Sequence, residues 1–158
     1  MSVHRYVHNR HSQVIRAEVR AARAGLGPWD PLPEDRLAAI GRRCGEVEVA
    51  EILAILDGLS AERAALPAWD GDSSDDIASA QSAYTTILGH VPPACLPAVA
   101  AGLASPLPDT RRWLTLALET LGAEALAALR AAREAEEDAT TRQFMTEAVG
   151  RLEAAAAA

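Results

Sequence analysis

The chain contains no lysine, and every one of its basic residues is arginine. Its net charge of −7 argues against a general binder of nucleic-acid backbones, because such binding rests on a positive surface. The charge is unevenly placed: residues 1–23 hold five arginines against the single Glu18, so the remainder is strongly acidic. This basic segment predicts a solvated helix face, or an arm that docks on the acidic body, on a partner or on anionic lipid.

Aromatic residues are also scarce, at 4% of the chain, although apolar residues make up 49%. Alanine, leucine and valine must therefore supply the packing, and alanine is the best helix former. Stretches that alternate between apolar and polar residues, as strands do, are missing. The composition predicts an all-α protein, and 158 residues suffice for one domain with a substantial core.

Cysteine is limited to Cys44 and Cys95, which are too few for a disulfide framework and form no CxxC motif. No continuous apolar run has the length of a secretory signal or of a bilayer-spanning helix. Glycine-rich phosphate loops and nucleophile-elbow motifs are missing as well. We therefore expect a cytoplasmic protein of bacterial type with no cofactor and no catalytic residue that the sequence identifies.

Glycine and proline divide the chain into about seven or eight predicted helices. The predicted helices cover 3–24, 34–43, 46–57, 73–89, 93–104, 109–121 and 123–135, and a last one begins at Asp138. Ser60 is expected to cap a short additional piece, and Ser73 or Ser74 to cap the helix that follows. The expected inward stripe of the first helix is Val3, Val7, Val14, Ile15, Val19 and Ala22.

Residues 92–107 include no charged side chain. Two interpretations fit this pattern: the helix is buried nearly all round, or one of its faces meets a partner. Burial is the expectation that we favour, because a central helix is the simpler reason for an uncharged segment.

A five-residue pattern recurs three times, at 83–87, 117–121 and 148–152, and successive copies begin 34 and 31 residues apart. Each copy begins with alanine, continues in most cases with a large apolar residue, and ends on leucine or isoleucine. This spacing puts the first and last residues on one helix face, one turn apart. Such a unit cannot bury its apolar face alone, so the pattern predicts stacked helices.

Residues 109–122 and 138–152 each resemble the first helix of a HEAT-type repeat, and residues 122–129 resemble the second. The resemblance covers about 73–155, and residues 34–57 are a degenerate earlier pair. It implies a short right-handed α-solenoid of stacked antiparallel helix pairs with a concave binding face and no shared catalytic residues. The expected organisation is one helical-repeat domain over 1–158, with a basic helix or arm at 1–27 and an alanine-rich tail at 154–158.

Two sets of side chains have the spacing of metal ligands. His4, His8 and His11 would share one helix face, a geometry that suits Zn²⁺ or Ni²⁺, but cationic Arg5 and Arg10 lie beside them. The acidic run 70–76 departs from the calcium-binding EF-hand pattern at its glycine and at its bidentate glutamate. We assign neither as a metal site.

Trp29 and Trp69 lie in predicted loops, and each is followed by aspartate. They could be binding anchors, since tryptophan is enriched at interaction hot spots, or they could fold back over the core. We favour folding back for both.

The resemblance implies that the second helix of each pair lines the concave side. The residues expected there are Glu46, Glu48, Glu51, Glu124, Arg130, Arg133 and Glu134. An acidic, partly apolar groove would suit a basic partner. The leading hypothesis is a protein–protein interaction module, an adaptor, a regulator or an inhibitor of the immunity type.

Two other classes of function remain open. A small all-α lyase, cyclase or isomerase would need a pocket between helices that holds a buried ionised residue. A helical-repeat nucleic-acid binder would need its arginines on one concave strip, namely Arg111, Arg112, Arg130, Arg133 and Arg151. The sequence alone does not predict the oligomeric state.

Overall fold

The computed structural model describes the backbone of residues 3–158 and the side chains from residue 13 onward. This part of the chain is all-helical and contains no strand. The α-helices are α1 Val3–Arg23, α2 Glu34–Arg42, α3 Glu46–Ala65, α4 Gly71–Leu88, α5 Leu96–Ala101, α6 Pro108–Leu121, α7 Leu126–Ala135 and α8 Ala139–Ala157. Short 3₁₀ helices cover η1 Pro93–Cys95, η2 Gly102–Ala104 and η3 Ala123–Ala125.

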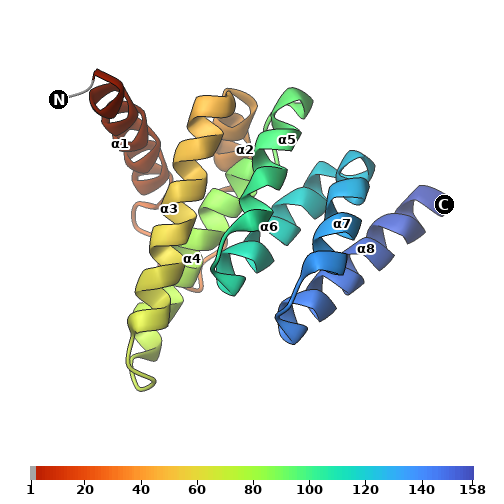
Figure 1. Ribbon diagram of the computed structural model, residues 1–158. Helices are drawn as coiled ribbons and strands as arrows, with labels where there is room; N and C mark the ends of the chain where they lie inside the picture. Colours follow the sequence, from red (N-terminus) through yellow and green to blue (C-terminus); the bar gives the residue numbers. More distant parts are fainter. Residues whose placement is uncertain (1–2) are drawn as a thin grey trace.

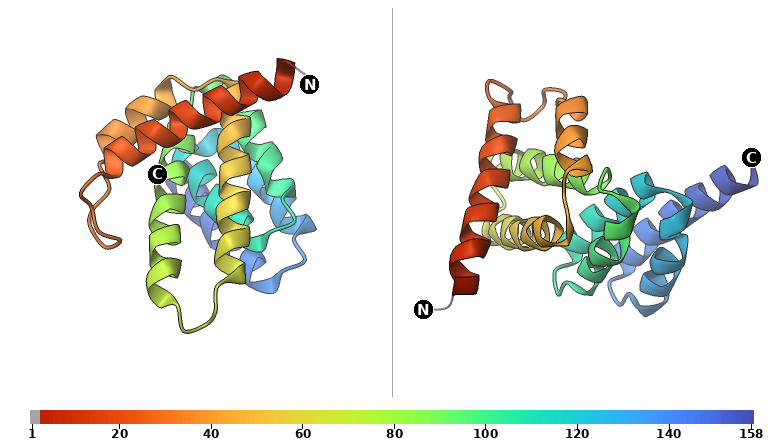
Figure 2. Two further views of the ribbon diagram at one scale, coloured as in Figure 1. Left: turned by 90° about the vertical axis from the view of Figure 1, so that its left-hand side faces the viewer. Right: turned by 90° about the horizontal axis from the view of Figure 1, so that it is seen from above.

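The helices lie in two layers that follow the order of the chain (Figure 1). In the first layer α2 contacts α4, α4 contacts α6, and α6 contacts α8. The second layer holds α1, α3, α5 and α7, with α3 packed against both α1 and α5. Helices α1 and α8 lie at opposite ends of the row, and Figure 2 shows α1 running at a steep angle to α3.

The three copies of the recurring pattern lie on α4, α6 and α8 and supply much of the core. Their most buried members are Ala83, Ile87, Ala117, Leu118, Ala148 and Val149. Alanine at the first position lets the neighbouring helix approach closely, and the larger residue fills the space one turn away. The buried side chains form one continuous cluster that extends from Ile15 in α1 to Leu152 in α8.

Helices α2 and α4 approach each other closely where a glycine permits it. A Cβ atom on Gly41 would lie 2.3 Å from the carbonyl oxygen of Ile87. No side chain fits there without moving the backbone.

Helix α3 is longer than the predicted helix 46–57, because it continues without a break to Ala65. Ser60 lies inside this helix and is buried, so the prediction that it caps a separate short piece is wrong. The side chain of Asp70 caps α4 by accepting a hydrogen bond from the Ser73 backbone, so the predicted serine cap is also wrong. The connection between α3 and α4 therefore spans only 66–70.

In α1, Ile15, Val19 and Ala22 are buried as predicted. Val14 is 58% exposed, which contradicts its place in the inward stripe. It directly precedes Ile15, so the two side chains point in different directions around the helix. The side chains of Val3 and Val7 lie outside the described residues.

The predicted helix 93–104 is broken into η1, α5 and η2. Proline at positions 93 and 97 favours short helical starts, because its ring fixes the backbone and removes a hydrogen-bond donor. Cys95 and Val99 are buried in this segment. The expectation of burial nearly all round is wrong, because the opposite face of the segment is exposed.

Candidate functional site

We call η1, α5 and η2 together, residues 93–104, the α5 segment. The exposed side of this segment carries only small or apolar side chains. Its exposed residues are Pro93, Ala94, Pro97, Ala101 and Ala104. Exposed helix faces of globular proteins normally carry charged or polar residues. An uncharged face that remains exposed is the feature of this fold that most needs an explanation.

The neighbouring helices of the same layer also expose small residues, on α7 together with the charged Arg130 and Glu134. Helix α3 exposes Ala50, Ala54, Gly58 and Ala61, and α7 exposes Ala127, Ala131 and Ala135. Each set is spaced three or four residues apart and therefore lies along one side of its helix. We call the exposed side of α3, α5 and α7 the outer face; in Figure 1 these helices lie side by side.

The charged residues predicted for binding border the α5 segment in two separate groups. Glu46, Glu48 and Glu51 lie on α3, whereas Glu124, Arg130, Arg133 and Glu134 lie on η3 and α7. The structure brings each group together on its own helix but does not join them, because α5 lies between. In the first group Glu48 accepts a hydrogen bond from the Gly45 backbone at 2.9 Å, at the start of α3.

The arginines that a nucleic-acid binder would require are mostly engaged with carboxylates. Arg112 pairs with Asp109, and Arg130 pairs with Glu153 at 2.5 Å. Arg151 pairs with Glu119 at 2.6 Å. These arginines are distributed over α6, α7 and α8.

Trp29 and Trp69 are 82% and 83% exposed, so the expectation that they fold back over the core is wrong. Trp29 lies in the connection between α1 and α2, and Trp69 in that between α3 and α4. Trp113, on α6, is partly buried.

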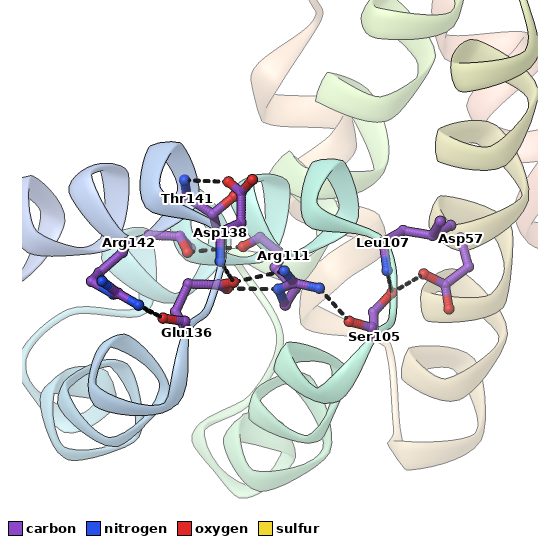
Figure 3. A network of polar contacts seen from close by, with 9 residues as sticks. Asp57, Ser105, Leu107, Arg111, Glu136, Asp138, Thr141 and Arg142 are labelled. Carbon is purple, nitrogen blue, oxygen red and sulfur yellow. Dashed lines mark hydrogen bonds and ion pairs between the residues drawn. The ribbon is translucent and has the colours of Figure 1, made fainter.

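A polar network that the sequence analysis missed joins α6 to the turn before α8 (Figure 3). The Arg111 guanidinium donates two hydrogen bonds of 2.7 Å to the Glu136 carboxylate, one to each oxygen. Its third nitrogen donates to the Ser105 carbonyl, also at 2.7 Å. Glu136 is only 6% exposed, and the hydrogen bond from Arg111 lowers the pKa of its carboxyl.

The same network contains a repeated contact 31 residues apart. Arg142 donates to the backbone carbonyl of Glu136, as Arg111 does to that of Ser105. In both cases the carbonyl lies six residues before the arginine. The spacing of 31 residues between Arg111 and Arg142 is visible in the sequence. A main-chain carbonyl is present at every residue, however, so a search for periodic apolar residues does not detect these hydrogen bonds.

A cavity of about 310 Å³ opens beside this network. It is lined by Leu103, Ala104, Ser105, Arg111, Ala132, Ala135, Glu136 and Glu137. An enzyme would need an ionised group here that is available to a substrate. Arg111, the arginine that lines this cavity, is partly buried and already has all three nitrogens engaged in the network.

A second polar cluster is buried where α3, α4 and α6 meet. The Gln81 amide donates to Ser60 at 3.0 Å and to Asp109 at 2.7 Å, and Thr110 donates to Ser60 at 2.9 Å. The Gln81 carbonyl oxygen has no protein partner. These bonds tie three helices together, and they explain why a serine lies inside α3.

The two thiols are buried, and the Cys95 sulfur lies 3.8 Å from the Cys44 carbonyl oxygen. Burial raises the pKa of Cys44 to about 11 and also raises that of Cys95. Both thiols are therefore protonated near neutral pH, and neither is activated as a nucleophile.

Among the described residues, no group of histidine, cysteine, aspartate and glutamate is placed to hold a metal ion. The side chains of His4, His8 and His11 lie outside the described residues.

Over residues 3–158, no single helix combines the length and the apolar character needed to cross a membrane. Helix α4 and residues 93–104 reach that length and apolar character only when taken together, and the chain bends by 117° between them. Comparison with known proteins finds no matching family model, no matching curated protein and no matching solved structure.

Proposed function

We propose that the chain is a short right-handed stack of antiparallel helix pairs, of HEAT-like type, that binds another protein through its outer face. In this proposal the pairs are α2 with α3, α4 with α5, and α6 with α7, and α8 closes the row. The contacts within each layer support this proposal, because α2, α4, α6 and α8 pack one on the next, and so do α1, α3 and α5. The protein would act as an adaptor, a regulator or an inhibitor.

The observation that carries the binding role is the uncharged yet exposed face of the α5 segment. A face that is solvated throughout its life has no need to exclude charge over residues 92–107. A face that a partner covers must exclude charge, because an unpaired charge in an interface core costs free energy. Small side chains would let the partner approach the helix backbone closely.

The borders of the α5 segment indicate the charge of the partner. The α3 side is acidic, with Glu46, Glu48 and Glu51, whereas the α7 side carries Glu124 and Glu134 together with Arg130 and Arg133. Charged residues at the rim of an interface mainly speed association and select the partner. A partner with basic residues around an apolar centre would fit both features.

Affinity capture from the source cells tests this proposal. The bait is the wild-type chain, Ala101→Arg on the outer face, or Gln143→Arg on α8 as the matched control. Both substituted positions are exposed, so each variant should keep the helical circular dichroism of the wild type.

We expect a protein with a basic surface to be retained by the wild type and by Gln143→Arg. We expect Ala101→Arg to retain it about tenfold less, because a buried, unpaired guanidinium costs at least about 1.4 kcal/mol. Equal retention by all three baits would contradict the proposed face, and so would the absence of any retained protein.

A further inference from the structure

Two tryptophan side chains are the most exposed large apolar groups in the described part of the chain. Trp69 is 83% exposed and Trp29 is 82% exposed, whereas Val14, the next in order, is 58% exposed. Neither lies on the outer face, since both are in connections between helices. Tryptophan is rarely left in water to this degree, and it is enriched at the centres of binding sites.

The two indoles are mounted on similar tight turns. In 27–30 the Asp30 backbone donates to the Gly27 carbonyl at 3.2 Å, and in 67–70 the Asp70 backbone donates to the Pro67 carbonyl at 3.0 Å. The aspartate side chain adds a second bond in each case. Asp30 accepts from the Gly27 backbone at 2.7 Å, and Asp70 accepts from the Ser73 backbone at 3.2 Å.

This arrangement orders the chain on both sides of each tryptophan. The indole is third in a turn whose ends are held, so it projects from a fixed backbone. Binding therefore costs little additional ordering of the main chain.

The charges along the chain around both turns are acidic. Residues 24–35 contain Asp30, Glu34 and Asp35 and no arginine. Residues 64–80 contain Asp70, Asp72, Asp75 and Asp76, and no arginine occurs between Arg63 and Arg111. Each indole is thus accompanied by carboxylates.

The arginine nearest to Trp69 in sequence is already engaged. The Arg63 guanidinium donates to the Ser74 hydroxyl at 3.1 Å and lies 3.4 Å from the Asp109 carboxylate. It therefore lies over the first turns of α4 and α6. At 83% exposure, the Trp69 ring is left largely uncovered by the side chains of the described residues.

We propose that the Trp29 turn and the Trp69 turn are further contact sites of this protein, each of which binds an arginine-rich segment of a partner. A guanidinium stacks on the indole face, and the aspartates of the same turn pair with it or with its neighbours. Both turns are separate from the outer face, and the inference does not depend on the function proposed for that face.

Arginine fits the two turns better than a metal ion or a lipid surface does. A calcium ion needs several oxygen ligands around one point, and no group of carboxylates among the described residues provides them. Anionic lipid would be repelled by the four aspartates of residues 70–76. A guanidinium satisfies both the ring and the carboxylates, which lysine does less well because its ammonium does not stack.

The probe is a fluorescein-labelled nona-arginine peptide, with nona-lysine as its counterpart, and its binding is followed by fluorescence anisotropy at low salt. The variants are Trp29→Ala, Trp69→Ala and the double substitution. Val47→Ala is the matched control, because it removes an exposed apolar side chain from α3 outside the two turns. Trp69→Phe keeps an aromatic face and tests for rescue.

We expect each tryptophan-to-alanine change to weaken nona-arginine binding about two- to fivefold, with Val47→Ala unchanged and Trp69→Phe partly restored. The preference of the wild type for nona-arginine over nona-lysine should disappear in the double variant. Unaltered nona-arginine binding by the double variant would overturn the inference. A second result would also overturn it: the wild type is retained on neutral phosphatidylcholine vesicles through its tryptophans and shows no preference for nona-arginine over nona-lysine.

The capture experiment with Ala101→Arg reports on the outer face alone. If Ala101→Arg loses the captured protein while the tryptophan variants bind nona-arginine as the wild type does, only the inference about the turns is refuted. The reverse pattern would refute only the function proposed for the outer face.

Discussion

At the scale of single residues, the Arg111–Glu136 pair is the interaction on which the junction between α6 and α8 most depends. It is bidentate, and Glu136 is almost fully buried. Removing one partner of a buried pair leaves the other desolvated and unpaired, which costs more than the pair itself contributes. The exposed pair between Arg151 and Glu119 lies in water and contributes much less.

We therefore expect Arg111→Ala to lower the free energy of unfolding by about 3 kcal/mol, and Arg151→Ala to lower it by less than about 1 kcal/mol. Urea denaturation followed by circular dichroism measures both. Equal losses from the two variants would show that the Arg111 pair is no more important than a surface pair.

The pair also predicts how stability depends on pH. The hydrogen bond from Arg111 lowers the pKa of Glu136 in the folded chain, whereas the unfolded carboxyl titrates near its ordinary value of 4.5. The contribution of this group is complete above that value and is lost as the pH falls toward the lowered pKa. Glu136→Gln should be less stable at neutral pH and should lose less stability on acidification below about pH 4.5. Thermal melts over this range measure the slope, and equal slopes in both proteins would refute the assignment.

At the scale of helices, glycine has opposite roles in α2 and α3. Gly41 faces the Ile87 carbonyl with no room for a Cβ atom, whereas Gly58 has no atom within 4 Å of that position. Both residues are helical, so they share the same cost in backbone entropy.

Gly58→Ala should raise the free energy of unfolding by about 0.5–1 kcal/mol, because alanine restricts the unfolded chain and disturbs nothing in the folded one. Gly41→Ala should lower it by about 2 kcal/mol, because α2 and α4 must move apart. Denaturant midpoints of the two variants check the signs. A stabilising Gly41→Ala would mean that the two helices are not in close contact.

Most helix positions could be predicted from the sequence, because glycine, proline and the recurring alanine pattern mark them. The exceptions are instructive. Ser60 was expected to start a helix, yet it lies inside α3, because its hydroxyl has partners in α4 and α6 that only the tertiary structure supplies. The lack of charge over 92–107 suggested burial, but it does not distinguish a buried face from one that lacks charge for another reason.

The charged residues of the candidate site were predicted less well. The helices that carry Glu46 and Glu124 could be predicted, but the distance between the two groups depends on how α3, α5 and α7 pack. Arg111 and Glu136 are 25 residues apart, and no local pattern pairs them. The loop that holds Trp69 could be predicted, but the cap of α4 is Asp70, whereas sequence reasoning assigns it to Ser73 or Ser74.

At the scale of the whole molecule, each helix contacts mainly its neighbours in the row, and the two ends are far apart (Figure 1). If the row is the modular stack that we propose, its stability is close to a sum of local terms, and damage at one end need not reach the other. A bundle around one shared centre would instead unfold as a unit.

Leu129 and Leu37 are both fully buried, in α7 and in α2. Leu129→Ala should remove about 3 kcal/mol of local stability and increase hydrogen exchange in α7 and α8 while sparing α2 and α4. Leu37→Ala should do the reverse. Hydrogen exchange followed by mass spectrometry resolves these segments, and a uniform increase over the whole chain in both variants would contradict a modular stack.

The central claim is that the outer face contacts a partner at the α5 segment. Photo-crosslinking in the source cells tests it most directly, with a benzophenone side chain introduced at position 101 or, as the control, at position 143 of α8. We predict that position 101 forms an adduct with one protein, that the linked peptide is basic with apolar residues, and that position 143 does not form this adduct. The absence of an adduct at position 101, or the same adducts at both positions, would contradict the claim.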